Sequence, residues 1–184
     1  MPKHVALLLD APMMSWGDSS PSFSLRGTGE QPTLSAMHGL VACCLGISAT
    51  EDARDFEELG YELSFSSDPL RLSGTPTLMD DHQVSRGTSS LPAWRRHAAV
   101  VDTDGKALPE GKLYHKHYLT GVVFGAVLQM KEEVADKVAH ALEDPVWPPY
   151  LGRKGCVPAS PIYQGVFDSV EEATAALQLA ASER

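Results

Sequence analysis

Hydrophobic and polar positions along the chain predict four strands. Residues 4–10 form an apolar run, which is typical of a strand buried on both faces. Residues 61–65 alternate between large apolar and polar side chains and predict a half-buried strand. Residues 121–129 predict a further buried strand, and a last core strand is expected near 162–167.

Three other segments carry apolar residues at helical spacing. The first covers 34–45, with Thr33 as its N-cap and Gly46 as its terminator. The second covers about 131–143 and stops before a proline. The third is rich in Ala and Leu and begins at Ser169-x-x-Glu172, which has the spacing of a capping box.

The order of these elements predicts one α+β domain over residues 1–184. Without the last helix the order is β-α-β, a long insertion, and β-α-β, which matches the ferredoxin-like split βαβ fold. Its sheet is antiparallel, with both helices on one face. The insertion covers 68–116, is rich in Pro, Gly, Ser and Asp, and lacks strong periodicity. We expect it to project as a hairpin or thumb that is partly disordered until it binds a partner.

Composition excludes several classes of protein. Hydrophobic residues make up 43% and charged residues 21% of 184 residues, an ordinary globular balance. The three cysteines include an adjacent pair and have neither a disulfide pattern nor zinc spacing. No apolar run approaches the roughly 20 residues of a membrane-spanning helix. We therefore expect a cytoplasmic protein with no membrane partner.

Charge is distributed unevenly. The chain has 15 Lys and Arg and 24 Asp and Glu, and the resulting net charge of −9 argues against loose, non-specific nucleic-acid binding. Basic residues nevertheless gather at 95–97, 112–117 and 153–154. An acidic protein with such local basic clusters can hold a polyanion in one defined groove.

The first candidate site is the loop that leads into the helix at 34–45. A helix N-terminus and its free backbone amides favour an anion. The loop adds one cation at Arg26, hydroxyls at Thr28 and Ser35, and a stacking plane at Trp16. The alternative interpretation is a surface loop in which Trp16 packs on the core.

The second candidate is the segment 113–118. On a strand, His115 and His117 share one face, and the other face carries Tyr114, Lys116 and Tyr118. These residues are consistent with acid–base ribonuclease chemistry, in which a histidine is the base and the lysine stabilises the phosphorane. We favour a basic and aromatic strand, including Lys116 and Tyr118, that contacts phosphates without catalysis.

A metal site on the same strand would need a third ligand. Asp80, Asp81 and His82 provide one only if the insertion folds back onto the two histidines. The sequence therefore leads us to expect no metal and no cofactor.

The third candidate is the turn at 149–156. Gly152 and Gly155 flank Arg153 and Lys154, so the arginine can be presented for bidentate phosphate contact. The alternative is a solvated turn. The chain has no nucleophile elbow, no zinc-protease motif and no phosphate-binding glycine motif.

Two of these segments carry a resemblance. The segment 12–17, the pattern Arg26-x-Thr28-x-x-x-Pro32-Thr33-x-Ser35-x-x-x-Gly39-Leu40 and the ending 44–47 resemble the N-terminal signature of the CasD family of CRISPR Cascade subunits. The segment 150–156, followed by Pro161, resembles the C-terminal motif of the type I-E members. Tyr118-Leu119 and Phe124 fall where this family has a Y-L…F strand.

The resemblance implies an RRM-like RAMP fold that grips the 5′ handle of a guide RNA. It also implies contact with the large subunit and the backbone subunit of the complex, and with target DNA indirectly. Carried over to this chain, the RNA contacts are Trp16, Arg26, Thr28, Ser35 and Arg153, with Asp81-His82 and Arg86 on the thumb. Lys154, beside Arg153, is a further expected contact. The chain ends soon after the last core strand and has Gly121 beside the Tyr-Leu pair, which suggests a compact variant.

Two other functions are alternatives. One is a metal-independent endoribonuclease that processes CRISPR repeat RNA, as type I-C relatives do with a Tyr/His/Lys set. The other is a small-molecule binding protein of the same fold, which would show a closed apolar pocket.

Overall fold

The computed structural model describes residues 1–17, 24–48, 64–65, 70–102 and 104–183. Six strands within these ranges form one sheet in the order β2–β5–β1–β6, and β3 and β4 also pair with β5. The strands are β1 (Pro2–Asp10), β2 (Leu25–Arg26), β3 (Ser64–Phe65), β4 (Leu70–Val84), β5 (Leu113–Lys131) and β6 (Tyr163–Phe167). The α-helices are α1 (Leu34–Leu45), α3 (Glu132–Glu143) and α4 (Val170–Ser182).

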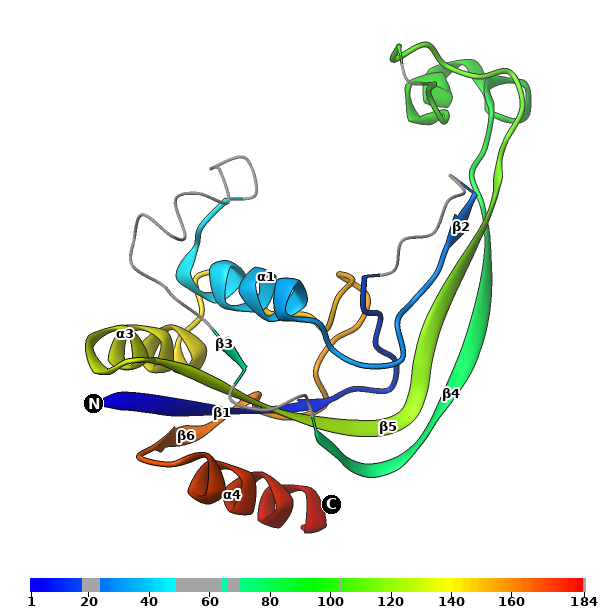
Figure 1. Cartoon of the computed structure of the whole chain (residues 1–184). Helices are drawn as coiled ribbons and strands as arrows, with labels where there is room; N and C mark the ends of the chain where they lie inside the picture. The colour runs from blue at the N-terminus through cyan, green and yellow to red at the C-terminus, as the bar shows by residue number, and fades with distance from the viewer. Residues whose placement is uncertain (18–23, 49–63, 66–69, 103, 184) are drawn as a thin grey trace.

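Strand β1 lies at the centre of the core. It pairs antiparallel with β5 on one side and with β6 on the other. Alternate residues Val5, Leu7 and Leu9 pack with α1 and α3, and Ala6 and Leu8 pack with α4. Helices α1 and α3 therefore cover one face of the sheet and α4 covers the other (Figure 1). Because both faces are covered, this strand is apolar throughout rather than alternating.

The three predicted helices are confirmed. The Thr33 hydroxyl accepts a hydrogen bond from the amide of Ala36 at 3.2 Å, and Gly46 ends α1 with a left-handed φ of 76°. Helix α3 covers the predicted segment. The Ser169 hydroxyl accepts from the amide of Glu172 at 3.2 Å and so caps α4 as its spacing predicted.

The segment 68–116, which lacks strong periodicity in the sequence, contains a long regular strand. Residues 70–84 form β4, which pairs with β5 from Leu70↔Gly125 to Val84↔Leu113. Strand β5 therefore begins at 113 rather than 121. The two strands form a long hairpin that bends away from the sheet (Figure 1). At an irregularity in the register, Gly74 has φ +73°, and a Cβ there would lie 2.1 Å from the carbonyl oxygen of Gly121.

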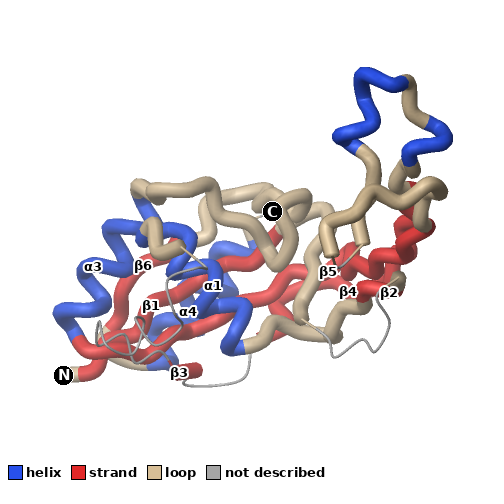
Figure 2. Tube along the Cα trace, turned by 90° about the horizontal axis from the view of Figure 1, so that it is seen from above, coloured by secondary structure: helices blue, strands red, loops and turns tan. Residues whose placement is uncertain are grey.

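The distal segment of this hairpin covers residues 85–112 and contains two short 3-10 helices, η1 (Thr88–Ser90) and η2 (Ala93–Ala98). They lie at the far end of the hairpin, away from α1, α3 and α4 (Figure 2). Of the strand predicted at 61–65, residues 64–65 are β3, and 61–63 lie outside the described residues. No helix among the described residues has both the length and the apolar character needed to cross a membrane.

Candidate nucleic-acid interface

Two segments that lie far apart in the sequence join beside α1. The amide of Ser15 donates to the carbonyl of Leu151 at 3.1 Å, and the amide of Leu151 donates to the carbonyl of Cys156 at 2.8 Å. The loop after β1 and the turn at 149–156 are thus connected by backbone hydrogen bonds. The two segments of the sequence resemblance therefore meet at one place in the fold.

A groove lies where these segments meet the N-terminal half of α1. Its volume is about 560 Å³, and among the described residues that line it there is no Asp or Glu. A Cβ built on Gly17 or on Gly39 would meet no atom of the described residues within 4 Å, so no described side chain covers the backbone at these two positions. The groove is lined by Ser15, Gly17, Thr33, Ser35, Ala36, Gly39, Leu40, Cys43, Tyr150 and Gly152.

The electrostatic character of the groove is set by α1 and by Lys154. Thr33 and Ser35 line it, so the positive end of the helix dipole is at its wall, and the first turn of α1 contains no acidic residue. Burial raises the pKa of the Cys43 thiol, and the positive charge of nearby Lys154 partly opposes that rise. In a protein of net charge −9, this is a surface that an anion can approach.

Arg153 joins the turn at 149–156 to the sheet. Its Nη1 donates to the carbonyl of His117 at 3.0 Å, and its Nη2 donates to the carbonyls of Arg26 and Gly27, both at 2.9 Å. The guanidinium also lies 4.8 Å from the centre of the Tyr118 ring. The expectation of a freely presented Arg153 is therefore wrong, because its guanidinium group already donates three hydrogen bonds to carbonyl oxygens.

Tyr118 is only 6% exposed and is covered by Arg153. The structure therefore leaves little of Tyr118 exposed for the phosphate contact that the sequence predicted.

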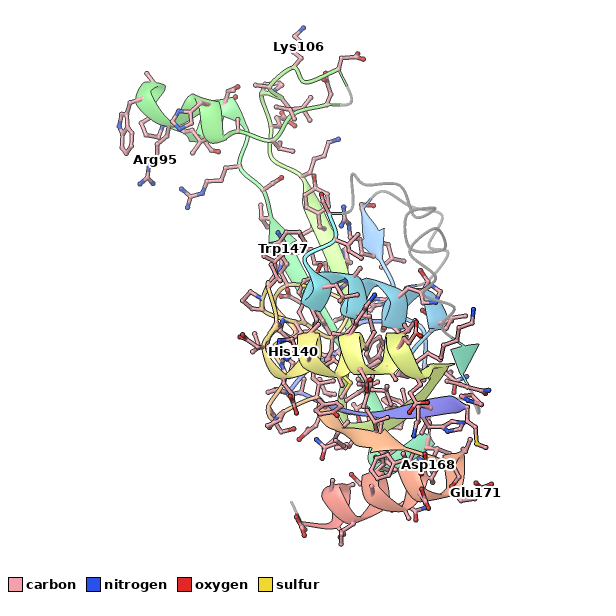
Figure 3. The ribbon with its side chains drawn as sticks, turned by 90° about the vertical axis from the view of Figure 1, so that its left-hand side faces the viewer. Arg95, Lys106, His140, Trp147, Asp168 and Glu171 are labelled. Carbon is pink, nitrogen blue, oxygen red and sulfur yellow. The ribbon has the colours of Figure 1, made fainter. Side chains whose placement is uncertain are left out.

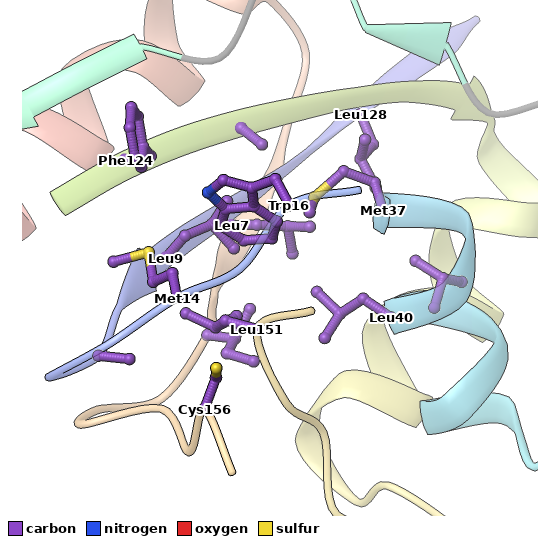
Figure 4. Packing of buried hydrophobic residues seen from close by; sticks show 14 of the residues in the cluster. Leu7, Leu9, Met14, Trp16, Met37, Leu40, Phe124, Leu128, Leu151 and Cys156 are labelled. Atoms are coloured by element: carbon purple, nitrogen blue, oxygen red, sulfur yellow. The ribbon is translucent and has the colours of Figure 1, made fainter. Parts of the chain in front are cut away.

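Trp16 is part of the core rather than a stacking plane. It is 1% exposed and packs among Leu7, Met37 and their neighbours (Figure 4). The amide of Trp16 donates to the Thr28 hydroxyl at 2.8 Å, so Thr28 fixes this loop. The stacking expectation for Trp16 is wrong for the physical reason that the ring has no free face. The alternative, a tryptophan packed on the core, is what the structure shows.

Of the remaining candidates on the body of the protein, Arg26, Ser35 and Lys154 are exposed and Thr28 is half-buried. Ser35 lines the groove, and Lys154 lies near Cys43 in its wall. The backbone of Arg26 is in β2, paired in parallel with Lys116 of β5. The RNA contacts of Arg26, Thr28, Ser35 and Lys154 stay predictions.

His82, Arg86 and Lys116 belong to the hairpin and not to the groove. His82 is exposed on β4, and Arg86 is exposed just beyond its end. The Lys116 ammonium donates to the side-chain carbonyl of Gln83 across the two strands. Arg95 and Lys106 lie farther out, in the distal segment (Figure 3). The RNA contacts of His82, Arg86 and Lys116 also stay predictions.

Sequence reasoning did not single out Tyr150, Cys43 or Gly39 as site residues. The detectable signal was Gly39, because a glycine inside an amphipathic helix costs about 1 kcal/mol relative to alanine and so invites an explanation. Cys43 and Tyr150 gave no comparable signal, since both types are common in partly buried positions.

The described sheet, its covering helices and the long hairpin define a mixed α+β protein that is structurally similar to RAMP-type CRISPR proteins. The model of the family described as CRISPR-associated protein (Cas_Cas5) matches residues 4–184, and the chain belongs to this family. It is 27% identical over 185 residues to the CRISPR system Cascade subunit CasD of Escherichia coli (strain K12). The aligned region covers 96% of this chain and 77% of that protein.

Solved structures of CRISPR proteins are among those similar to this chain. A chain of a CRISPR RNA-guided surveillance complex has 30% identity and a TM-score of 0.74, with 92% of this chain and 66% of that chain covered. A crystal structure of a Cas protein has 25% identity and a TM-score of 0.55, with 93% and 69% covered. The chain thus spans about two thirds of the length of each of these structures.

Proposed function

We propose that this protein is a non-catalytic subunit of a Cascade-type effector complex, in which it binds and caps the 5′ handle of the guide RNA in antiviral defence. Membership of the family and the likeness to a Cascade subunit support this function. The observation that carries it is the groove in which two distant segments and the N-terminus of α1 meet, and whose described lining residues include no carboxylate.

The groove suits the backbone of a single RNA strand. The helix dipole and the amides of the first turn of α1 favour a phosphate. Thr33, Ser35 and Tyr150 provide hydroxyls that can bond phosphate and ribose oxygens. The bare backbone at Gly39 lets a sugar–phosphate chain approach the helix closely.

The hairpin is proposed to be the thumb of the family, on a frame with ferredoxin-like strand order. Its distal segment carries the exposed cations Arg86, Arg95 and Lys106 and the exposed Trp94, which is 70% accessible. Such a basic and aromatic end is suited to nucleic acid or to a neighbouring subunit. We propose that it contacts the guide RNA and the large and backbone subunits, and target DNA only indirectly.

The alternative function, cleavage of repeat RNA, has weaker support. On β5 the histidines and the Tyr/Lys set lie on opposite faces, so they do not converge on one phosphate. We expect labelled repeat RNA to stay intact when it is incubated with the purified protein in EDTA. Specific cleavage that disappears in His115→Ala would instead establish the nuclease.

The groove is tested by filling it. Gly39→Glu adds a charged side chain where the structure has open space, so we expect the affinity for RNA that carries the 5′ handle to fall at least tenfold. Ala175→Glu makes a similar change on an exposed position of α4 and serves as the matched control. Fluorescence anisotropy with the protein, alone and with the backbone subunit, measures both. Equal affinity of the two variants, or no binding by the unmodified protein in either form, would contradict the proposal.

A further inference from the structure

Four metal-binding side chains project from one face of the hairpin. Asp80 and His82 are two residues apart on β4, and His115 and His117 are two residues apart on β5. The register pairs Asp80 with His117 and His82 with His115. Because residues i and i+2 of a strand share a face, the four side chains form a square across two neighbouring strands.

The ligand atoms of this square are close together. The Nε2 of His82 is 3.0 Å and the Nδ1 of His115 is 3.4 Å from Oδ2 of Asp80. The Nε2 of His117 is 3.8 Å from Oδ1 of the same carboxylate. The ligand atoms of Asp80, His82 and His115 all lie within 4.8 Å of one another.

We propose that Asp80, His82, His115 and His117 form a binding site for a late first-row divalent transition-metal ion of the Zn²⁺ class. Imidazole nitrogens with one carboxylate are typical ligands of such ions, whereas Mg²⁺ and Ca²⁺ prefer oxygen ligands alone. Tetrahedral bonds of about 2.0–2.2 Å place ligand atoms roughly 3.4 Å apart. The separations of the histidine nitrogens from the Asp80 oxygens, 3.0–3.8 Å, are close to that value, so small side-chain rotations would bring these atoms to bonding positions.

Other roles explain the cluster less well. Asp80 and His82 have side-chain exposures of 43% and 57%, so the packing of the core does not require them there. His82 and His115 both face the same oxygen of Asp80, Oδ2, although Oδ1 has acceptor sites as well. Their rings are 4.3 Å apart. A metal ion would accept one nitrogen from each ring and so account for the grouping.

The site would also have a structural consequence that does not depend on the proposed function. It crosses from β4 to β5 next to the last pair of the hairpin, Val84↔Leu113, where the distal segment begins. The carbonyl of His117 accepts the hydrogen bond from Arg153. A bound ion would therefore connect the base of the distal segment to the body of the protein.

The experiment measures Zn²⁺ binding to tag-free protein by competition with a chromophoric chelator, with Co²⁺ absorption as a second probe. We expect one equivalent to bind, and Mg²⁺ in excess not to compete. Asp80→Ala and His115→Ala should each weaken binding by at least about 10–100-fold, which is the loss seen when a residue that only hydrogen-bonds to a metal ligand is removed. Asp81→Ala, the neighbouring carboxylate on the other face, and His140→Ala, an exposed histidine of α3, are matched controls and should bind normally.

Absence of saturable binding by the unmodified protein would overturn the proposal. Equal binding by Asp80→Ala, His115→Ala and the two controls would also overturn it. Circular dichroism shows whether each variant keeps its fold. If one does not, imidazole NMR signals of the unmodified protein decide: Zn²⁺ must shift those of His82 and His115 and leave that of His140 unchanged.

Discussion

The carbonyl oxygen of Ser15 lies where a side chain on Gly152 would begin. Gly152 has φ +92°, and a Cβ there would be 1.5 Å from that oxygen. Only glycine tolerates both the left-handed conformation and this approach of two backbones. The contact fixes the loop after β1 against the turn at 149–156, and with it one wall of the groove.

We predict that Gly152→Ala destabilises the protein by about 2–5 kcal/mol, because the new methyl group both clashes and strains the backbone. Gly155→Ala in the same turn is the control, since its Cβ would meet only the Met13 methyl at 3.6 Å. That variant should stay within about 0.5 kcal/mol of the unmodified protein. Urea unfolding measures both. Equal stability of the two variants would mean that the contact with Ser15 is not tight.

Arg153 is predicted to act on stability through its three carbonyl partners. Arg153→Ala should lower the free energy of unfolding by about 1.5–3 kcal/mol, the range for hydrogen bonds to a charged group. Lys154→Ala, the exposed neighbour, should change it by less than about 0.5 kcal/mol. Thermal unfolding of the two variants checks this. If Arg153→Ala unfolds like the unmodified protein and only its affinity for RNA falls, the arginine serves the ligand rather than the fold.

Substitution of Gly39 by alanine tests whether this glycine is present for the ligand or for the stability of the fold. Its Cβ would meet open space, and its position is within α1, so Gly39→Ala should stabilise the protein by about 0.5–1 kcal/mol. Chemical denaturation measures this gain. A loss of stability would show that the glycine is required for packing, and the argument that its space is kept for a ligand would then fail.

The ion pair between Lys3 and Asp168 predicts a dependence on pH. The hydrogen bond from Lys3 Nζ to Asp168 Oδ1, 2.7 Å long, and the lysine's charge lower the pKa of Asp168. A lowered carboxyl pKa gives stability that is present above the ordinary value and lost as the pH falls through the folded-state value. The same pair raises the pKa of Lys3, so the contribution also disappears at alkaline pH.

NMR titration of Asp168 in the unmodified protein and in Lys3→Gln tests this pair. The pKa of Asp168 should rise in the variant toward the ordinary carboxyl value. Lys137→Gln on α3 removes an exposed cation of the body and should leave that pKa unchanged. An Asp168 that titrates alike in all three proteins would show that the pair does not persist in solution.

The sequence predicted those elements whose signals are local. Thr33, Gly46 and Ser169 mark helix ends through their own hydrogen bonds and dihedrals, so α1 and α4 were predictable. Strand β4 was missed because most of it is exposed, and a strand without a buried face shows no alternation of polar and apolar residues.

Site residues were harder to predict because their partners are distant in the chain. Arg153 bonds to carbonyls 36, 126 and 127 residues away, and composition cannot tell a carbonyl partner from a phosphate. The square of Asp80 and the histidines likewise depends on the pairing of β4 with β5. The sequence alone could state only the condition that the insertion folds back.

The central claim, that the groove beside α1 holds the 5′ handle, is tested most directly by photo-crosslinking. Guide RNA with 4-thiouridine in its handle would be irradiated in the assembled complex, and crosslinked peptides would be identified by mass spectrometry. We predict crosslinks within 33–43 and 150–156, with Tyr150 and Cys43 as the expected residues, and none within α4 on the opposite face of the sheet. Crosslinks confined to α4 or to other surfaces, with none from the groove, would contradict the account.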